Sequence, residues 1–160
     1  MGMTTTLYRT DFYAWTKKQA ALLQAEEFEK LDLPNLVEEL EAIGNSQRTE
    51  VISRLKVLVM HLLKWQFQAD HRSRSWRNTI NVQRWDLEAV LEDNPSLQPE
   101  LAECLAKAYP RARREAIQET GLLRSPWPTT CPWTLTQILD ETWLPDESCW
   151  VASSEDKCIA

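Results

Sequence analysis

The stretch VISRLKVLVMHLLKWQF, residues 51–67, decides the fold. At 100° per residue, an arc of about 140°, which is broad for a surface helix, holds Val51, Ile52, Leu55, Leu58, Val59, Leu62 and Leu63. Val57, Met60, Trp65 and Phe67 widen this arc further, and only Ser53, Lys56 and Lys64 stay clearly outside it. The pattern predicts a central helix that is buried on most sides.

Helical patterns surround this segment on both sides. Before it, Asp11 is placed to cap a helix over residues 12–30, and Asn35 to cap a helix from residue 36 that ends or bends near Gly44. After it, apolar side chains recur at helical spacing over residues 74–93, and again over residues 96–121, with Ser96 as cap and Gly121 as stop. Pro110 lies inside the last of these helices and should kink it.

The C-terminal quarter differs in composition, because four prolines alternate there with four tryptophans. One short helix over residues 134–140 is expected within this arm, and its tryptophans should bury it against the other helices. The predicted fold is therefore all-α, a four-helix up-and-down bundle with a Pro/Trp-rich C-terminal arm. It forms a single domain over residues 7–145, followed by a frayed tail over residues 146–160.

Length and composition exclude several classes of protein. A chain of 160 residues with 43% hydrophobic content can form its own core. A membrane-spanning helix requires an apolar run of about 18 residues, and the sequence contains none. Residues 1–11 carry no charged segment followed by an apolar core, which predicts a cytoplasmic protein. The four cysteines form no Cys-x-x-Cys pair and are interpreted as reduced thiols.

The scarcity of histidine and glycine argues against common kinds of catalytic site. Two histidines cannot build the usual three-histidine or His-Glu-x-x-His metal centres, and three isolated glycines cannot build a phosphate-binding loop. We therefore expect no metal and no cofactor, and a protein that is not an enzyme. Cys104 with His61 is the remaining thiol and imidazole combination, but a helical cysteine of this kind usually packs in a core.

The net charge of −6 conceals an uneven distribution. Residues 1–45 hold four Lys and Arg against eight Asp and Glu, residues 46–85 hold eight against two, and residues 86–160 hold six against fourteen. An acidic chain thus has a basic middle with a charge of +6. We call its eight cationic side chains the basic middle: Arg48, Arg54, Lys56, Lys64, Arg72, Arg74, Arg77 and Arg84.

Two polar stripes run along the helices of this region. One holds Glu50, Arg54, His61 and Gln68, and the other holds Arg77, Asn81, Arg84 and Glu88. If the two helices pack antiparallel through the turn at residues 70–73, one end of the bundle gathers arginines and aromatic rings, which suit a phosphate, a carboxylate or a nucleic-acid backbone. The expected ligand or partner residues are His61, Trp65, Arg72, Arg74, Trp76, Arg77 and Arg84.

The same charges also suit a purely structural network. Arg54 with Glu50, and Arg84 with Glu88, are pairs four residues apart on one helix. Arg77 could reach the carboxylates of the earlier helices, which are Glu38, Glu39 and Glu41. Pairs of this kind fix register in helical bundles and need no ligand.

Several segments resemble one bacterial family, catalogued as domain of unknown function 29. They are LYRTDFYAW (7–15), LDLPNLVEELE (31–41), HLLKWQFQ (61–68), RSRSW (72–76), QR (83–84), ETGL (119–122) and CPWTL (131–135). The resemblance implies a compact all-helical bundle and brings no established activity, substrate or cofactor. The positions that match the family's central signature are His61, Trp65, Arg72, Arg74, Trp76 and Arg84.

Three functional hypotheses follow. The first is a non-enzymatic cytoplasmic interaction module that binds an acidic protein or anionic ligand through its basic, aromatic-flanked hairpin, residues 48–84. The second is binding of nucleic acid or a phosphate ligand by the same surface. The third is an enzyme centred on His61 with Glu50 or Glu39, which requires the imidazole to lie exposed in a pocket wall.

Overall fold

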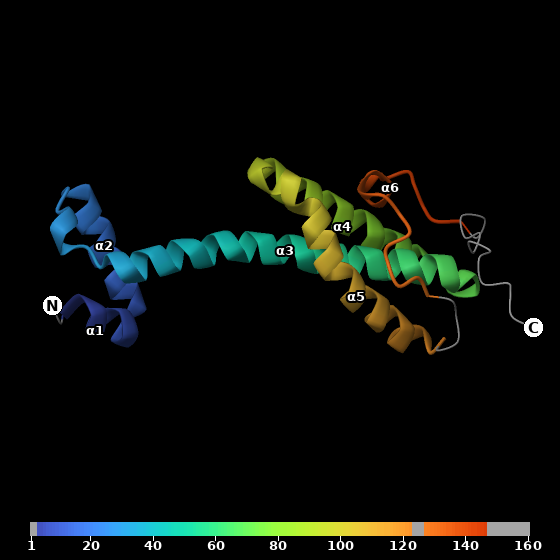
Figure 1. Ribbon diagram of the computed structural model, residues 1–160, viewed down its shortest axis with the longest axis horizontal. Coiled ribbons are helices and arrows are strands. Elements are labelled where there is room, and N and C mark those ends of the chain that lie inside the picture. The colour runs from blue at the N-terminus through green and yellow to red at the C-terminus, as the bar shows by residue number, and fades with distance from the viewer. Residues whose placement is uncertain (1–2, 123–126, 147–160) are drawn as a thin grey trace, which may run out of the picture. The chain divides into compact units, whose positions relative to one another are not determined.

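The computed structural model describes residues 3–122 and 127–146, and every regular element in these ranges is a helix. The prediction of an all-α fold is confirmed (Figure 1). The chain divides into an N-terminal unit, Met1–Ser46, and a C-terminal unit, Gln47–Ala160. The helices, with 3-10 helices marked η, are α1 Met3–Thr10, α2 Phe12–Gln24, η1 Phe28–Lys30, α3 Leu33–Phe67, η2 Ala69–His71, α4 Arg74–Asp93, η3 Pro95–Glu100, α5 Leu101–Thr120 and α6 Leu135–Leu139.

The N-terminal unit contains α1, α2, η1 and the start of α3. The predicted cap is confirmed, because the Asp11 side chain accepts a hydrogen bond from the Ala14 N–H. The predicted extension of this helix to residue 30 is wrong, since α2 ends at Gln24 and Glu26 takes a left-handed conformation with φ of 57°. A residue with positive φ cannot continue an α-helix, so the chain turns there and resumes as η1.

The helix α3 runs from Leu33 to Phe67 without ending at Gly44. Asn35 is not its cap, because Asn35 lies inside the helix and donates a hydrogen bond to Asp32. Asp32 is buried and also accepts a hydrogen bond from the Trp15 indole at 3.2 Å, while its own N–H donates to Gln19 Oε1. These contacts tie α2 to the start of α3.

The main hydrophobic core lies in the C-terminal unit. It is formed by the apolar sides of α3, α4 and α5, as the pattern of residues 51–67 predicted. Val51, Leu55, Leu58, Leu62 and Leu63 of α3 are completely buried. Burial of such side chains contributes about 1.5–3 kcal/mol each, so the second half of α3 organises this unit.

The helix α4 has the predicted bounds, and the start of α5 differs from the prediction. The Ser73 hydroxyl caps α4 by accepting from the Trp76 N–H. Ser96 caps no α-helix, because residues 95–100 form η3 and α5 begins at Leu101. At the other end, Gly121 has φ of 66° and closes α5 as predicted, and the helix continues through the exposed Pro110.

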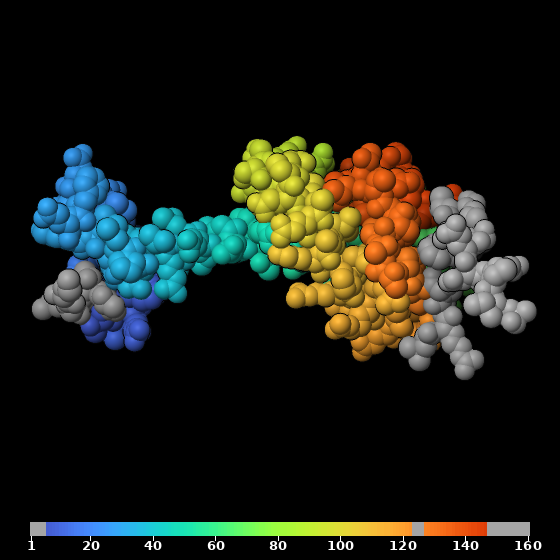
Figure 2. Space-filling model, in the orientation of Figure 1, coloured from blue at the N-terminus to red at the C-terminus, as the bar shows by residue number. Residues whose placement is uncertain are grey.

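The arm after residue 127 packs side by side with α5 (Figure 2, orange beside gold). Trp127 and Trp133 are buried in the core, and Tyr109 of α5 donates a hydrogen bond to the Pro128 carbonyl at 2.8 Å. The short helix α6 begins with a capping box between Thr134 and Gln137. The predicted tail, apart from Asp146, lies outside the described residues.

Within residues 3–122 and 127–146, no helix combines the length and the apolar character that a membrane crossing requires.

Candidate functional site

Four cations of the basic middle form ion pairs within the C-terminal unit. Arg54 contacts both Glu50 and Asp86, which joins α3 to α4, and the predicted pair with Glu50 is therefore present. The other three pairings connect α3 to η3 and α5: Arg48 with Glu100 and Glu103, Lys56 with Glu115, and Lys64 with Glu119, at 2.6–2.9 Å. These carboxylates neutralise much of the local positive charge.

Arg84 binds the main chain of the arm rather than an acid on its own helix. Its Nε donates to the Ile138 carbonyl at 2.8 Å and its Nη2 donates to the Trp143 carbonyl at 2.9 Å. The side chain is only 3% exposed, and burial lowers the pKa of its guanidinium group. The expected pair with Glu88 is not formed, because the guanidinium group holds the end of α6 instead.

Two cations contact aromatic rings where α3 turns into α4. Arg72 donates from Nε to the Trp65 carbonyl at 2.8 Å, and its guanidinium lies 5.3 Å from the centre of the Trp65 ring. Lys64 Nζ lies 4.6 Å from the centre of the Trp76 ring. Such contacts stabilise a cation over a ring face. Arg72 and Lys64 therefore each have a tryptophan partner where α3 and α4 meet.

His61 lies on α3 with a half-buried ring. Its Nδ1 hydrogen-bonds the Val57 carbonyl at 2.9 Å, and burial lowers the pKa of the imidazole. Glu50, the predicted acidic partner, is occupied by Arg54. The four cavities that the described parts of α4, α5 and the C-terminal arm border are lined by side chains other than His61.

Arg74 and Arg77 differ from the rest of the basic middle. Both are exposed on α4, and neither forms an ion pair with a residue that the structure describes. Arg74 borders an open hollow with Asn78, Thr79 and Val82. On the same side of the helix, Val82 and Trp85 are 44% and 51% exposed. We call this side the α4 outer face: Arg74, Arg77, Asn78, Val82 and Trp85.

The acidic residues that were proposed as partners of Arg77 belong to the N-terminal unit. Tyr8 donates a hydrogen bond to Glu39, which raises the pKa of the tyrosine to about 12. Glu38 and Glu41 are exposed. Arg77 belongs to the C-terminal unit.

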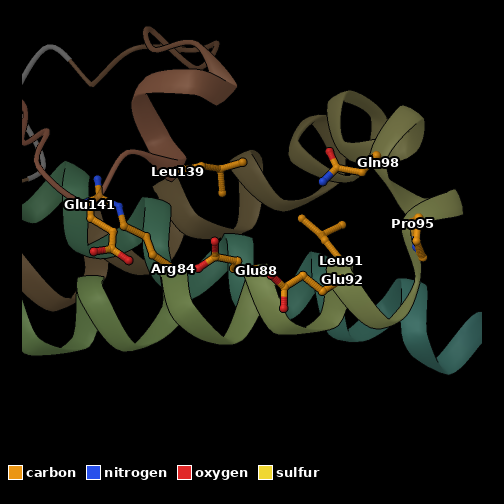
Figure 3. Close-up of a pocket in the computed structure, with 8 residues that line it drawn as sticks. All are labelled: Arg84, Glu88, Leu91, Glu92, Pro95, Gln98, Leu139 and Glu141. Carbon is orange, nitrogen blue, oxygen red and sulfur yellow. The ribbon is translucent and has the colours of Figure 1, made fainter.

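A cavity of about 400 Å³ lies between α4, η3 and α6 (Figure 3). Its wall combines the arginine that holds the arm with three carboxylates and apolar side chains: Arg84, Glu88, Leu91, Glu92, Pro95, Gln98, Leu139 and Glu141. Glu141 is also bound by the Trp85 indole at 2.7 Å. The sequence did not predict this cavity. It indicates only that Glu88 and Glu92 share one side of a helix, and it does not indicate that residues of η3 and of the arm lie beside them.

The described residues provide few groups for covalent or metal chemistry. No cluster of three His, Cys, Asp or Glu side chains that could hold a metal ion occurs among them. Cys104 and Cys131 are free thiols, and burial raises the pKa of both, which disfavours the nucleophilic thiolate.

The fold and the site define a small all-helical protein in which most of the basic middle serves internal packing and one basic helix face stays open. The chain belongs to the family described as Domain of unknown function DUF29, whose model matches residues 7–144. This match confirms the resemblance in the sequence. No curated protein and no solved structure matched the chain.

Proposed function

We propose that this protein is a non-enzymatic interaction module that binds an acidic segment of a partner protein through the α4 outer face. The observation that carries the proposal is the contrast within the basic middle. Arg48, Arg54, Lys56 and Lys64 contact carboxylates, whereas Arg74 and Arg77 are exposed without a described acidic partner. Carboxylates of a partner protein would form charge-assisted hydrogen bonds with these two guanidinium groups.

The remaining residues of the α4 outer face support a protein partner. Val82 and Trp85 place apolar surface beside the two arginines. Tryptophan and arginine are the residue types that contribute most to protein interfaces. A ligand that combines carboxylates with apolar side chains therefore fits this face better than a phosphate backbone, which offers no apolar contact.

The proposal is tested with a fluorescein-labelled helical peptide that has glutamates on its flanks and leucines on one side. We expect fluorescence anisotropy to show binding that weakens at least tenfold in the double variant Arg74→Glu with Arg77→Glu. The matched control is Arg111→Glu with Arg114→Glu, which changes the charge equally on exposed positions of α5 and should bind as the wild type does. Equal weakening in both variants would show that the peptide responds to the net charge of the protein and does not bind the α4 outer face specifically.

The same assay with a labelled DNA oligonucleotide tests the competing function. Nucleic-acid binding would decrease steeply with salt, because each neutralised phosphate releases counterions. Binding of the oligonucleotide at 50 mM salt that is abolished by the α4 double variant would assign the face to nucleic acid. We expect no such binding.

A further inference from the structure

A row of exposed apolar side chains runs along the start of α3, in the N-terminal unit. We call it the apolar row. Figure 2 shows this start of α3, in blue to cyan, at the surface. Its members and their exposed fractions are Leu33 57%, Val37 52%, Leu40 67% and Ile43 60%.

The spacing places the apolar row on one side of the helix. Offsets of 0, 4, 7 and 10 residues fall within an arc of about 120° at 100° per residue. Gly44 continues the row, and a Cβ added there would meet nothing within 4 Å. A partner backbone could therefore approach closely at this point.

The N-terminal unit uses a different side of α3 for its own packing. Asn35 contacts Asp32, and Glu39 receives the hydrogen bond from Tyr8 of α1. Both residues lie outside the arc of the apolar row. The row is therefore not the surface that holds α1 and α2 in place.

Exposed apolar side chains are concentrated in this unit. Among the described residues, the C-terminal unit exposes Val82 and Trp85 as large apolar side chains, whereas the N-terminal unit exposes eight. Contiguous apolar surface of this kind marks a binding site more often than an ordinary exterior. Its four regularly spaced members on α3 match the way in which one helix binds another.

The charges beside the apolar row are all negative. The part of α3 from residue 33 to residue 47 carries Glu38, Glu39 and Glu41 and no Lys or Arg. Glu41 is exposed, pairs with no described cation and lies about 40° beyond the edge of the row at Val37, whereas Glu38 lies on the opposite side of the helix. The cations elsewhere in this unit lie on other elements, where Lys30 pairs with Glu27 and Lys17 lies over the Tyr13 ring.

We propose that the apolar row, together with Glu41, is a docking surface for a basic amphipathic helix of a partner protein. The apolar side of that helix covers Leu33, Val37 and Leu40, and its lysines or arginines contact Glu41. Charge decides against pairing of the row with the same row of a second copy, because that pairing brings glutamates together without a compensating cation. This site is independent of the α4 outer face, which selects the opposite charge.

The length of the row sets the length of the partner segment. From Leu33 to Ile43 the helix rises about 15 Å at 1.5 Å per residue. A partner helix of about 12–15 residues, with apolar side chains at i, i+3 or i+4, and i+7, spans the row.

The test uses a labelled 15-residue peptide of leucine and lysine with this amphipathic spacing, and a peptide of the same composition in scrambled order. We expect the full-length protein to bind the amphipathic peptide in fluorescence anisotropy and to bind the scrambled peptide at least tenfold more weakly. The variant Val37→Asp with Leu40→Asp should lower the affinity at least tenfold. Glu41→Gln should lower it several-fold and reduce its dependence on salt, whereas Glu38→Gln, on the opposite side of the helix, should leave it nearly unchanged.

Leu23→Asp with Phe28→Asp is the matched control, because it introduces the same two negative charges at exposed apolar positions outside the row and should leave this binding unchanged. Circular dichroism checks that each variant keeps its helices, which is expected at exposed positions.

Three results would overturn the proposal. Unchanged affinity in Val37→Asp with Leu40→Asp would show that the peptide binds elsewhere. A wild-type dimer in light scattering that this variant converts to a monomer would show that a second copy covers the row. Protection of the row from carbene labelling in the free monomer would show that the chain covers it itself.

Discussion

Arg84 is a charged residue whose partners are main-chain carbonyl groups. Its Nε and Nη2 hold the Ile138 and Trp143 carbonyls, so its loss affects the arm directly. We expect Arg84→Met to lower the free energy of unfolding by about 1–3 kcal/mol, because the buried Ile138 carbonyl and the partly buried Trp143 carbonyl lose charged donors. Urea unfolding followed by tryptophan fluorescence measures the change.

The matched control for this prediction is Arg77→Met on the same helix. Arg77 is exposed and should change stability by no more than about 0.5 kcal/mol. Equal losses in the two variants would show that Arg84 does not anchor the arm.

His61 gives stability a defined dependence on pH. Burial places the pKa of the folded imidazole below its usual value of about 6.5, so the unfolded chain binds the proton more readily. This contribution is complete above that value and is lost as pH falls from about 6.5 toward the lower pKa of the folded state. In His61→Gln this loss should be absent.

Thermal unfolding of the wild type and His61→Gln between pH 7.5 and pH 5 measures the effect. A slope that persists in His61→Gln would assign the dependence to other groups.

Among the elements, two glycines have opposite roles in their helices. Gly121 ends α5 in a left-handed conformation, whereas Gly44 lies inside α3 with open space at its Cβ position. We expect Gly121→Ala to destabilise the protein by about 1 kcal/mol and Gly44→Ala to stabilise α3 by about 0.5–1 kcal/mol. Thermal melts followed by circular dichroism measure both, and a change of the same sign in both would contradict the assignment.

The sequence predicted elements well where local signals agree. The bounds of α4 and the stop at Gly121 follow from apolar spacing and from turn chemistry that acts within a few residues. The end of α2 was missed because Glu26 has no intrinsic preference for positive φ. Ser96 was read as a cap, but residues 95–100, with prolines at positions 95 and 99, form the tighter η3 instead.

At the scale of the whole molecule, the residues that form the main core predict which part of the chain can fold by itself. All members of the main buried cluster come from residues 51–138, and Trp15 of α2 is not among them. We expect a fragment from Gln47 to Ala160 to unfold cooperatively and to keep its helical signal, because it contains that entire core. Calorimetry of the fragment and of the full chain checks this expectation.

Failure of the fragment to fold would support the single domain over residues 7–145 that the sequence pattern indicates. A matched full-length variant, Trp15→Ala, separates the two cases. It should alter the exchange of amides in residues 12–36 and leave those of the core helices protected.

The candidate site was less predictable than the fold. The basic middle and the contact of Arg72 and Lys64 with tryptophans follow from residues that are near in the chain. The pairings of Lys56 with Glu115 and of Lys64 with Glu119 join residues 59 and 55 positions apart, which periodicity cannot match. The arginines left open on α4 could be recognised only after those partners were known.

The contacts of Arg84 also affect how the protein is made. Its carbonyl partners lie 54 and 59 residues later in the chain, so the ribosome delivers them after α4 and α5. Until they emerge, the nascent chain holds a guanidinium group without its main-chain acceptors at the edge of a forming core. Completion of the unit therefore waits until Trp143 has emerged, and we expect a chain that stops before Trp143 to be degraded by proteases more readily than one that contains it.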